Sequence, residues 1–124
     1  MSKQIEFFQF LQNTPVSEME HTINQWLMEK GESVAIVHSQ CSENDVHLVF
    51  SLIYHAKPAE KQKTNPKLVK MFRAPVACQD LKNEMNNWFK GYGKDIEVNR
   101  CLQTSTEQHI TLLIIYRSSR NKIG

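Results

Sequence analysis

The chain contains the same pattern of residues twice, and this repeat constrains its fold more than any other feature. A shift of 62 residues places Met19, Ile23, Trp26 and Leu27 on Leu81, Met85, Trp88 and Phe89. The same shift places His47, Leu48, Phe50, Leu52, Ile53 and Tyr54 on His109, Ile110, Leu112, Ile114, Ile115 and Tyr116. Cys41 and Cys101 also correspond, at an offset of 60, which predicts a two-residue difference in the loops that follow them. Shared spacing of this kind indicates one duplicated supersecondary unit.

Each copy has the pattern of a strand, a helix and two further strands. Residues 3–10 and 67–74 carry aromatic and branched side chains without a breaker, which is typical of strands. The apolar residues at 19, 23, 26 and 27 form one face of a helix, and Ser17 with Glu20 predicts a capping box at its start. Residues 33–41 with 46–55, and 95–103 with 108–117, predict two hairpins. The predicted fold class is therefore α+β: two β-α-β-β repeats, each an antiparallel three-stranded sheet with one helix packed on one face.

The domain organisation follows from the length of the repeats. A unit of about 60 residues is marginally stable alone because it buries too little surface. We therefore expect one compact pseudo-symmetric unit, made of a first repeat (residues 1–55), a linker (56–66) and a second repeat (67–124). The linker, AKPAEKQKTNP, has two prolines and three lysines and nothing to bury.

The second strand of each hairpin predicts a sheet with two partly apolar faces. Alternate residues from Leu48 to Tyr54, and from Ile110 to Tyr116, form the face that receives the helix. The opposite face carries Val49, Ile53 and their counterparts, and is too apolar for free solvent. We expect this second face to pack on the other repeat or on another subunit, which favours a homo-oligomer.

Three cysteines without a Cys-x-x-Cys pair suit a reducing compartment. The apolar runs are too short to span a membrane, and the N-terminal residues lack the pattern of a signal peptide. The expected location is the cytoplasm, with no membrane partner.

Charge differs sharply between the repeats. Residues 1–62 carry a net −4 and residues 63–124 a net +6, which gives +2 for the whole chain. Every arginine lies in the second repeat. The excess is explained by drift of solvated surface residues after duplication, or by an anionic ligand held by arginine.

No motif predicts catalysis, a metal or a cofactor. The sequence has no phosphate-binding glycine loop and no nucleophile elbow, and its five histidines show no zinc-ligand spacing. His47 and His109 occupy equivalent positions, which is more typical of polar residues at strand edges than of bases. Trp26 and Trp88 are expected in the core.

Two equivalent tyrosines are each followed by a basic or titratable residue: Tyr54 by His55 and Tyr116 by Arg117. A tyrosine beside a cation at the end of a sheet can stack a base and hold a phosphate. It can equally be an interfacial tyrosine with a solvated hydroxyl. Both interpretations remain open.

Each copy resembles the short Cse-type sporulation protein family of phages and spore-forming bacteria. The matching segments are Ile23-Asn24-Gln25-Trp26-Leu27 with Leu52-Ile53-Tyr54-His55, and Met85-Asn86-Asn87-Trp88-Phe89 with Ile114-Ile115-Tyr116-Arg117. The family pattern ends in Tyr-Arg, so His55 departs from it in the first copy.

The strand-helix-hairpin unit is also similar to phage immune-evasion sponge proteins, which assemble as oligomers and sequester cyclic nucleotide signals of bacterial defence. At fold level it resembles the flavin-binding dodecins. The resemblance implies a phage-encoded tandem version acting in the cytoplasm of a bacterial host.

Three functions follow as hypotheses. The first is a non-enzymatic binder of a cyclic di- or trinucleotide. Its expected ligand contacts are Arg73, Arg100, Arg117, Tyr54, Tyr116 and His55. The second is a protein-binding inhibitor or host-takeover factor that uses the outer sheet face. The third is a single-stranded nucleic-acid binder that uses the basic second repeat.

Overall fold

A computed structural model describes residues 3–30, 34–56, 65–92 and 95–119. The first repeat contains strand β1 (Lys3–Leu11), helix α1 (Val16–Lys30), and strands β2 (Val34–Glu43) and β3 (His47–Ala56). The second contains β4 (Lys67–Ala74), α2 (Gln79–Tyr92), β5 (Ile96–Ser105) and β6 (Ile110–Ser118). The strands form two antiparallel three-stranded sheets, β1-β3-β2 and β4-β6-β5, here called the first and the second sheet. The predicted α+β fold of two β-α-β-β repeats is confirmed. Most of the expected linker, residues 57–64, lies outside the described residues.

Strand register shows how closely the two sheets correspond. Pairing between β2 and β3 shifts by one residue at Val37, and pairing between β5 and β6 shifts at the equivalent Asn99. The predicted match of Cys41 with Cys101 is wrong, because Cys41 faces Phe50 whereas Gln103 faces its counterpart Leu112. The hairpins keep the offset of 62 throughout.

The length difference between the repeats instead lies before the helices. Lys3 pairs with His55, and Lys67 pairs with the equivalent Arg117, so β1 and β4 are offset by 64. The two-residue difference therefore falls between the first strand of each repeat and its helix. This pair of offsets gives a residue-by-residue correspondence between the repeats.

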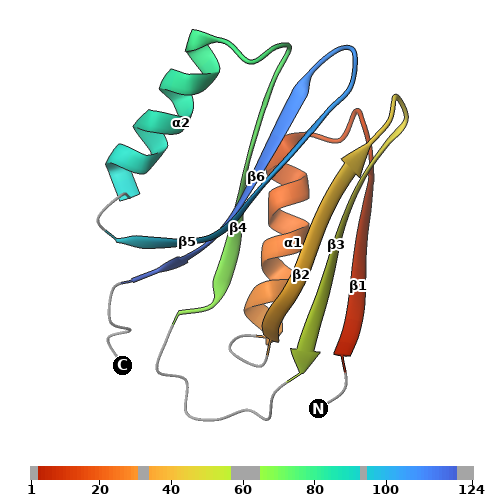
Figure 1. The fold of residues 1–124 in the computed structure, drawn as a ribbon, viewed down its shortest axis with the longest axis vertical. Coiled ribbons are helices and arrows are strands. Elements are labelled where there is room, and N and C mark those ends of the chain that lie inside the picture. The colour runs from red at the N-terminus through yellow and green to blue at the C-terminus, as the bar shows by residue number, and fades with distance from the viewer. Residues whose placement is uncertain (1–2, 31–33, 57–64, 93–94, 120–124) are drawn as a thin grey trace.

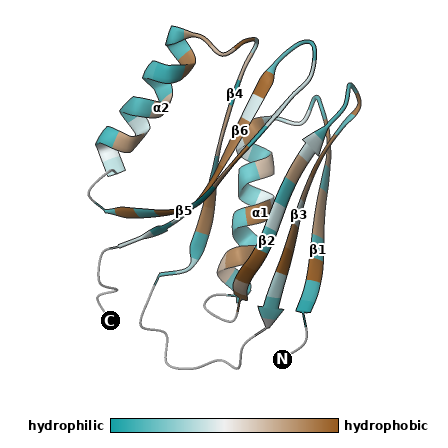
Figure 2. Cartoon of the chain, viewed as in Figure 1, coloured by the Kyte–Doolittle hydropathy of each residue, from teal (hydrophilic) through white to brown (hydrophobic). Residues whose placement is uncertain are grey.

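The elements stack as four layers: the first sheet, α1, the second sheet and α2 (Figure 1). The hydrophobic colours of Figure 2 lie mainly along the strands. We call the sheet face covered by the helix of its own repeat the inner face, and the opposite face the outer face. As predicted, Leu48, Phe50 and Leu52 on the inner face of the first sheet are fully buried beneath α1. Ile114 packs with Leu81 on the corresponding side of the second sheet.

Helix α1 is shared by both repeats. Its apolar residues Met19, Ile23 and Leu27 belong to one buried cluster with the inner face of the first sheet and the outer face of the second. The second sheet contributes Val69, Met71, Leu113 and Ile115, all at most 2% exposed. The outer face of the second sheet therefore packs on the other repeat, one of the two expected outcomes.

Polar side chains of α1 also bind the free edge of β4. Val69 N donates to Asn24 Oδ1 at 2.7 Å, and Asn24 Nδ2 donates to Val69 O at 3.1 Å. Met71 N donates to Glu20 Oε1 at 3.2 Å, and Lys70 Nζ lies 3.5 Å from the same oxygen. The capping box predicted for Glu20 is replaced by these contacts, because its carboxylate is directed to β4. Edge-strand amides that would otherwise lack partners are thus satisfied.

Candidate functional site

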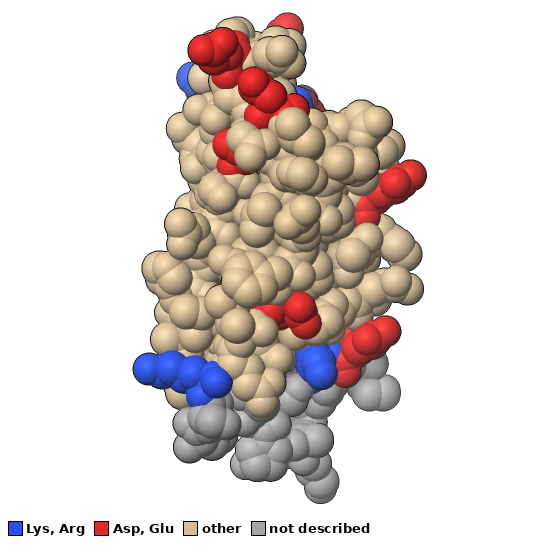
Figure 3. All heavy atoms as spheres, turned by 90° about the vertical axis from the view of Figure 1, so that its right-hand side faces the viewer, with Lys and Arg blue, Asp and Glu red and all other residues tan. Residues whose placement is uncertain are grey.

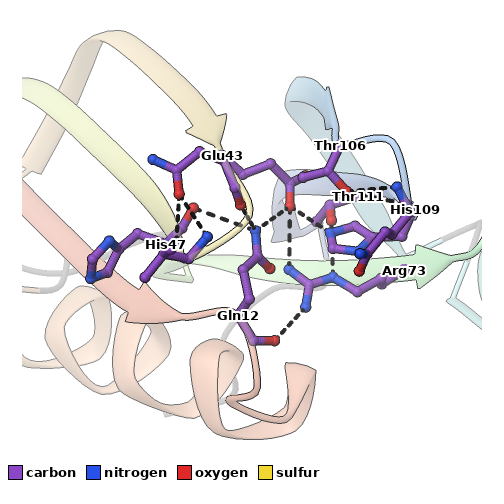
Figure 4. Close-up of polar contacts among 10 residues, drawn as sticks. Gln12, Glu43, His47, Arg73, Thr106, His109 and Thr111 are labelled. Atoms are coloured by element: carbon purple, nitrogen blue, oxygen red, sulfur yellow. Dashed lines mark hydrogen bonds and ion pairs between the residues drawn. The ribbon is translucent and has the colours of Figure 1, made fainter.

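A polar cluster joins the two repeats at the loop end of the sheets (Figure 4). Glu43, at the end of β2, accepts a hydrogen bond from Gln12 Nε2 at 2.9 Å and contacts His109 Nε2 at 2.6 Å. From β4, Arg73 Nη2 lies 3.7 Å from Glu43 Oε1. Arg73 also donates to Thr111 Oγ1 at 3.0 Å and to Gln12 O at 3.2 Å. Two residues from the first repeat and three from the second therefore form one network.

Burial and charge decide the state of Glu43, whose side chain is 0% exposed. Burial on its own raises the pKa of this carboxyl. Hydrogen bonds from Gln12, His109 and Thr111, together with attraction to His109, outweigh burial and hold the pKa below its ordinary value of 4.5. The carboxylate is therefore ionised and paired within the cluster.

The nearby thiol of Cys41 is not suited to act as a nucleophile. Burial, and then the negative charge of Glu43, raise the pKa of Cys41 to about 12, although Arg73 acts in the opposite direction. A thiol with so high a pKa stays protonated at neutral pH and reacts poorly. The cluster therefore suits the joining of the two repeats rather than catalysis, because the buried Glu43 carboxylate is inaccessible to a substrate.

The three arginines expected to bind phosphate lie apart and already have protein partners. Arg73 belongs to the buried cluster. Arg100 Nη2 donates to Val37 O at 3.1 Å and to Ile36 O at 3.5 Å, linking β5 to β2. Arg117 Nη2 donates to Glu97 Oε2 at 2.9 Å, six residues along β6 from the position that faces Arg73.

The remaining expected contacts are divided between the repeats. Tyr54 is buried against Trp26 and donates its hydroxyl to Gln4 Oε1 at 2.9 Å. Tyr116 packs edge-on against Trp88, and burial, followed by Glu20 and Tyr92, raises its pKa above 10. His55 is half-buried, and its Nδ1 has no hydrogen-bond partner among the described residues. The structure does not bring the six residues into one site.

A second feature is an exposed apolar patch on the outer face of the first sheet. Ile5, Phe7 and Leu11 on β1 are more than half exposed, with Phe7 at 60%. In the sheet they lie beside Ile53, Ser51 and His47 of β3. Figure 3, seen from the β1 side, shows few charged residues across the middle of the molecule. On the second sheet, Met71 occupies the position of Phe7 and is only 2% exposed because α1 covers it.

A groove lies on the flank of α2 and, like the patch, contains large apolar side chains. It has a volume of about 520 Å³, and its lining includes Leu81, Met85 and Phe89, with Lys82 and Asn86 at its side. Leu81, Met85 and Phe89 are the counterparts of Met19, Ile23 and Leu27, the α1 residues that pack between the two sheets. On α1 that flank is covered by β4, whereas on α2 Met85 and Phe89 are only partly buried.

Sequence reasoning did not identify Glu43 or Gln12, and it predicted the outer face of the first sheet as an interface from Val49 and Ile53 without the exposed residues of β1. One available signal was the difference between the repeats. Arg73 stands where the first repeat has Gln9, and Glu43 stands where the second has Ser105. At each of these two positions only one repeat has a charged residue. The two charged residues meet where the repeats are in contact.

Among the described ranges, no three His, Cys, Asp or Glu side chains are placed to share a metal ion. None of the helices in those ranges has the length and apolarity needed to cross a membrane. Comparison with protein-family models, with curated proteins and with solved structures found no significant match. The resemblance to the Cse-type family therefore stays a prediction.

Proposed function

We propose that this protein is a non-enzymatic binding protein whose partner is another protein. The partner places one of its helices on the outer face of the first sheet. One observation carries the proposal. The face containing Ile5, Phe7 and Ile53 is exposed, whereas the equivalent face of the second sheet is covered by a helix, α1. Exposed apolar patches of this kind are typical of interaction sites.

The choice of a helix as the bound element rests on the same comparison. A helix packs on the second sheet by placing apolar residues on Val69 and Met71 and polar residues on the strand edge. The first sheet offers the same two features, since Ile5 and Phe7 lie on the edge strand β1, whose outer side faces solvent. An amphipathic helix fits such a surface through residues at i, i+3, i+4 and i+7.

Photo-crosslinking tests this function. A benzoylphenylalanine at position 7, in the cells that naturally express the chain, should form a protein adduct whose crosslinked residue, identified by mass spectrometry, lies on a helix. The matched control is the same residue at position 28, because Met28 is similarly exposed (56%) but lies on α1. Equal adduct yields at positions 7 and 28 would contradict the proposal.

Sequestration of a cyclic oligonucleotide is a second candidate, favoured by the surroundings of Arg117. This side chain lines a cavity of about 130 Å³ with Lys67, Val98 and Asn99, and it pairs with Glu97, which is 64% exposed. An exposed carboxylate can be displaced by a phosphate, which binds arginine through paired hydrogen bonds. A cavity of this size admits a phosphate group and leaves the bases outside.

Arg117→Ala tests this candidate. Charge-assisted hydrogen bonds contribute about 1.5–3 kcal/mol each, so the variant should bind a cyclic dinucleotide roughly tenfold or more weakly by calorimetry. His55→Ala is the control at the equivalent position of the first sheet, and it should have a smaller effect. Equal losses in the two variants, or no binding by the parent chain, would exclude this site.

A further inference from the structure

The contact between the repeats has an unused counterpart at each end of the molecule. Internally, Glu20 and Asn24 of α1 bind β4 beside an apolar contact. Their equivalents on α2 are Lys82 and Asn86, both exposed along the open groove. The equivalent of β4 is β1, the exposed edge of the first sheet. Figure 1 shows α2 and β1 on opposite sides of the molecule, so one copy can use both surfaces at once.

The charges at these two surfaces are complementary. In the internal contact, the Glu20 carboxylate accepts from Met71 N and pairs with Lys70. At the unused surfaces Glu20 is replaced by Lys82, and Lys70 by Glu6. Phe7 N, the counterpart of Met71 N, already donates to Glu6 Oε1 at 3.1 Å. A carboxylate, an ammonium group and a backbone amide are thus present in both cases. At the unused surfaces the carboxylate is on the strand and the ammonium group is on the helix.

The other polar positions are also compatible. Asn86 retains the amide with which Asn24 binds the backbone of Val69, and its target would be the backbone of Ile5. The buried pair of Glu43 with Arg73 is replaced by Ser105 and Gln9, which are both neutral. No like charges would therefore meet at these positions.

Resting on the proposed function, we propose that the bound helix is α2 of a second copy of this chain. Its groove receives Ile5 and Phe7, and Lys82 pairs with Glu6 of the other copy. Because two different surfaces meet, the contact is head-to-tail, and each copy leaves one surface of each kind for the next. Such assemblies close into rings or extend as filaments.

A charge swap tests this assembly by sedimentation velocity over a concentration series. Lys82→Glu and Glu6→Lys should each weaken self-association about tenfold or more, because like charges placed together at an interface oppose binding. Combining both substitutions in one chain should restore association, because the pair is rebuilt with its charges reversed. Lys90→Glu is the control, since it makes the same charge change on α2 outside the groove. Unchanged circular dichroism would verify folding of each variant.

Failure of this inference can be distinguished from failure of the proposed function. A monomeric parent chain, or a double variant no better than the single ones, would overturn self-assembly. Adducts from position 7 that map to residues 77–89 of this chain would support it. Adducts on a helix of a different protein would overturn it while leaving the proposed function in place. Absence of specific adducts would remove both.

Discussion

Ile23→Ala should destabilise the protein by about 4 kcal/mol in chemical denaturation, within the range measured for large-to-small changes in cores. Ile23 is fully buried and belongs to one cluster with side chains from both sheets. Its removal leaves a cavity that two packed layers cannot close easily. Because domains of this size are stable by only about 5–15 kcal/mol, the variant should be near the limit of folding.

The matched control is Met85→Ala, at the equivalent position of α2. Met85 is only partly buried against the cluster of Leu81 and Ile114 and borders the open groove, so solvent can enter the space that its side chain leaves. We expect a loss of about 2 kcal/mol, at the low end of the range for methionine-to-alanine changes in cores, because the site is already partly open to solvent. Equal losses at positions 23 and 85, measured at a concentration where the chain is monomeric, would contradict the sandwiched position of α1.

Arg73→Ala should cost about 3–5 kcal/mol of unfolding free energy, as expected when one partner of a buried ion pair is removed. The change would leave the Glu43 carboxylate, which is 0% exposed, without its nearby guanidinium. Arg117→Ala removes an ion pair at the surface, where Glu97 is 64% exposed, and should cost less than about 1 kcal/mol. Similar losses in the two variants would show that the cluster joining the repeats is solvated.

The same cluster predicts how stability changes with pH. The folded-state pKa of Glu43 is lowered from 4.5, so the unfolded chain binds this proton more readily. Its contribution is therefore complete above about pH 4.5 and is lost as the pH falls through the folded-state value. A Glu43→Gln variant should be less stable than the parent at pH 7, and the difference should shrink toward pH 3. A constant difference would mean that the pKa of Glu43 is the same in the folded and the unfolded chain.

The repeated apolar spacing was sufficient to predict the elements and their order. Periods of two and of about 3.6 residues depend on local geometry, so the strands around Phe50 and Leu112 and the helices around Ile23 and Met85 were all found. The predicted inner faces were right for the same reason. The match of Cys41 with Cys101 was wrong because chemical identity is weaker evidence than strand register, which pairs Cys41 and Gln103 with equivalent residues.

The sequence alone could not decide which repeat would cover which face. Both outer faces have similar apolar character, yet only the second sheet packs on α1, while Phe7 and its neighbours stay exposed. That asymmetry comes from the stacking of one repeat on the other, which joins residues 61 to 66 positions apart, such as Gln12 with Arg73 and Glu43 with His109. No local period records contacts of that range. Arg73 was predicted from its charge, but only its position opposite Glu43 showed that this charge holds the two repeats together.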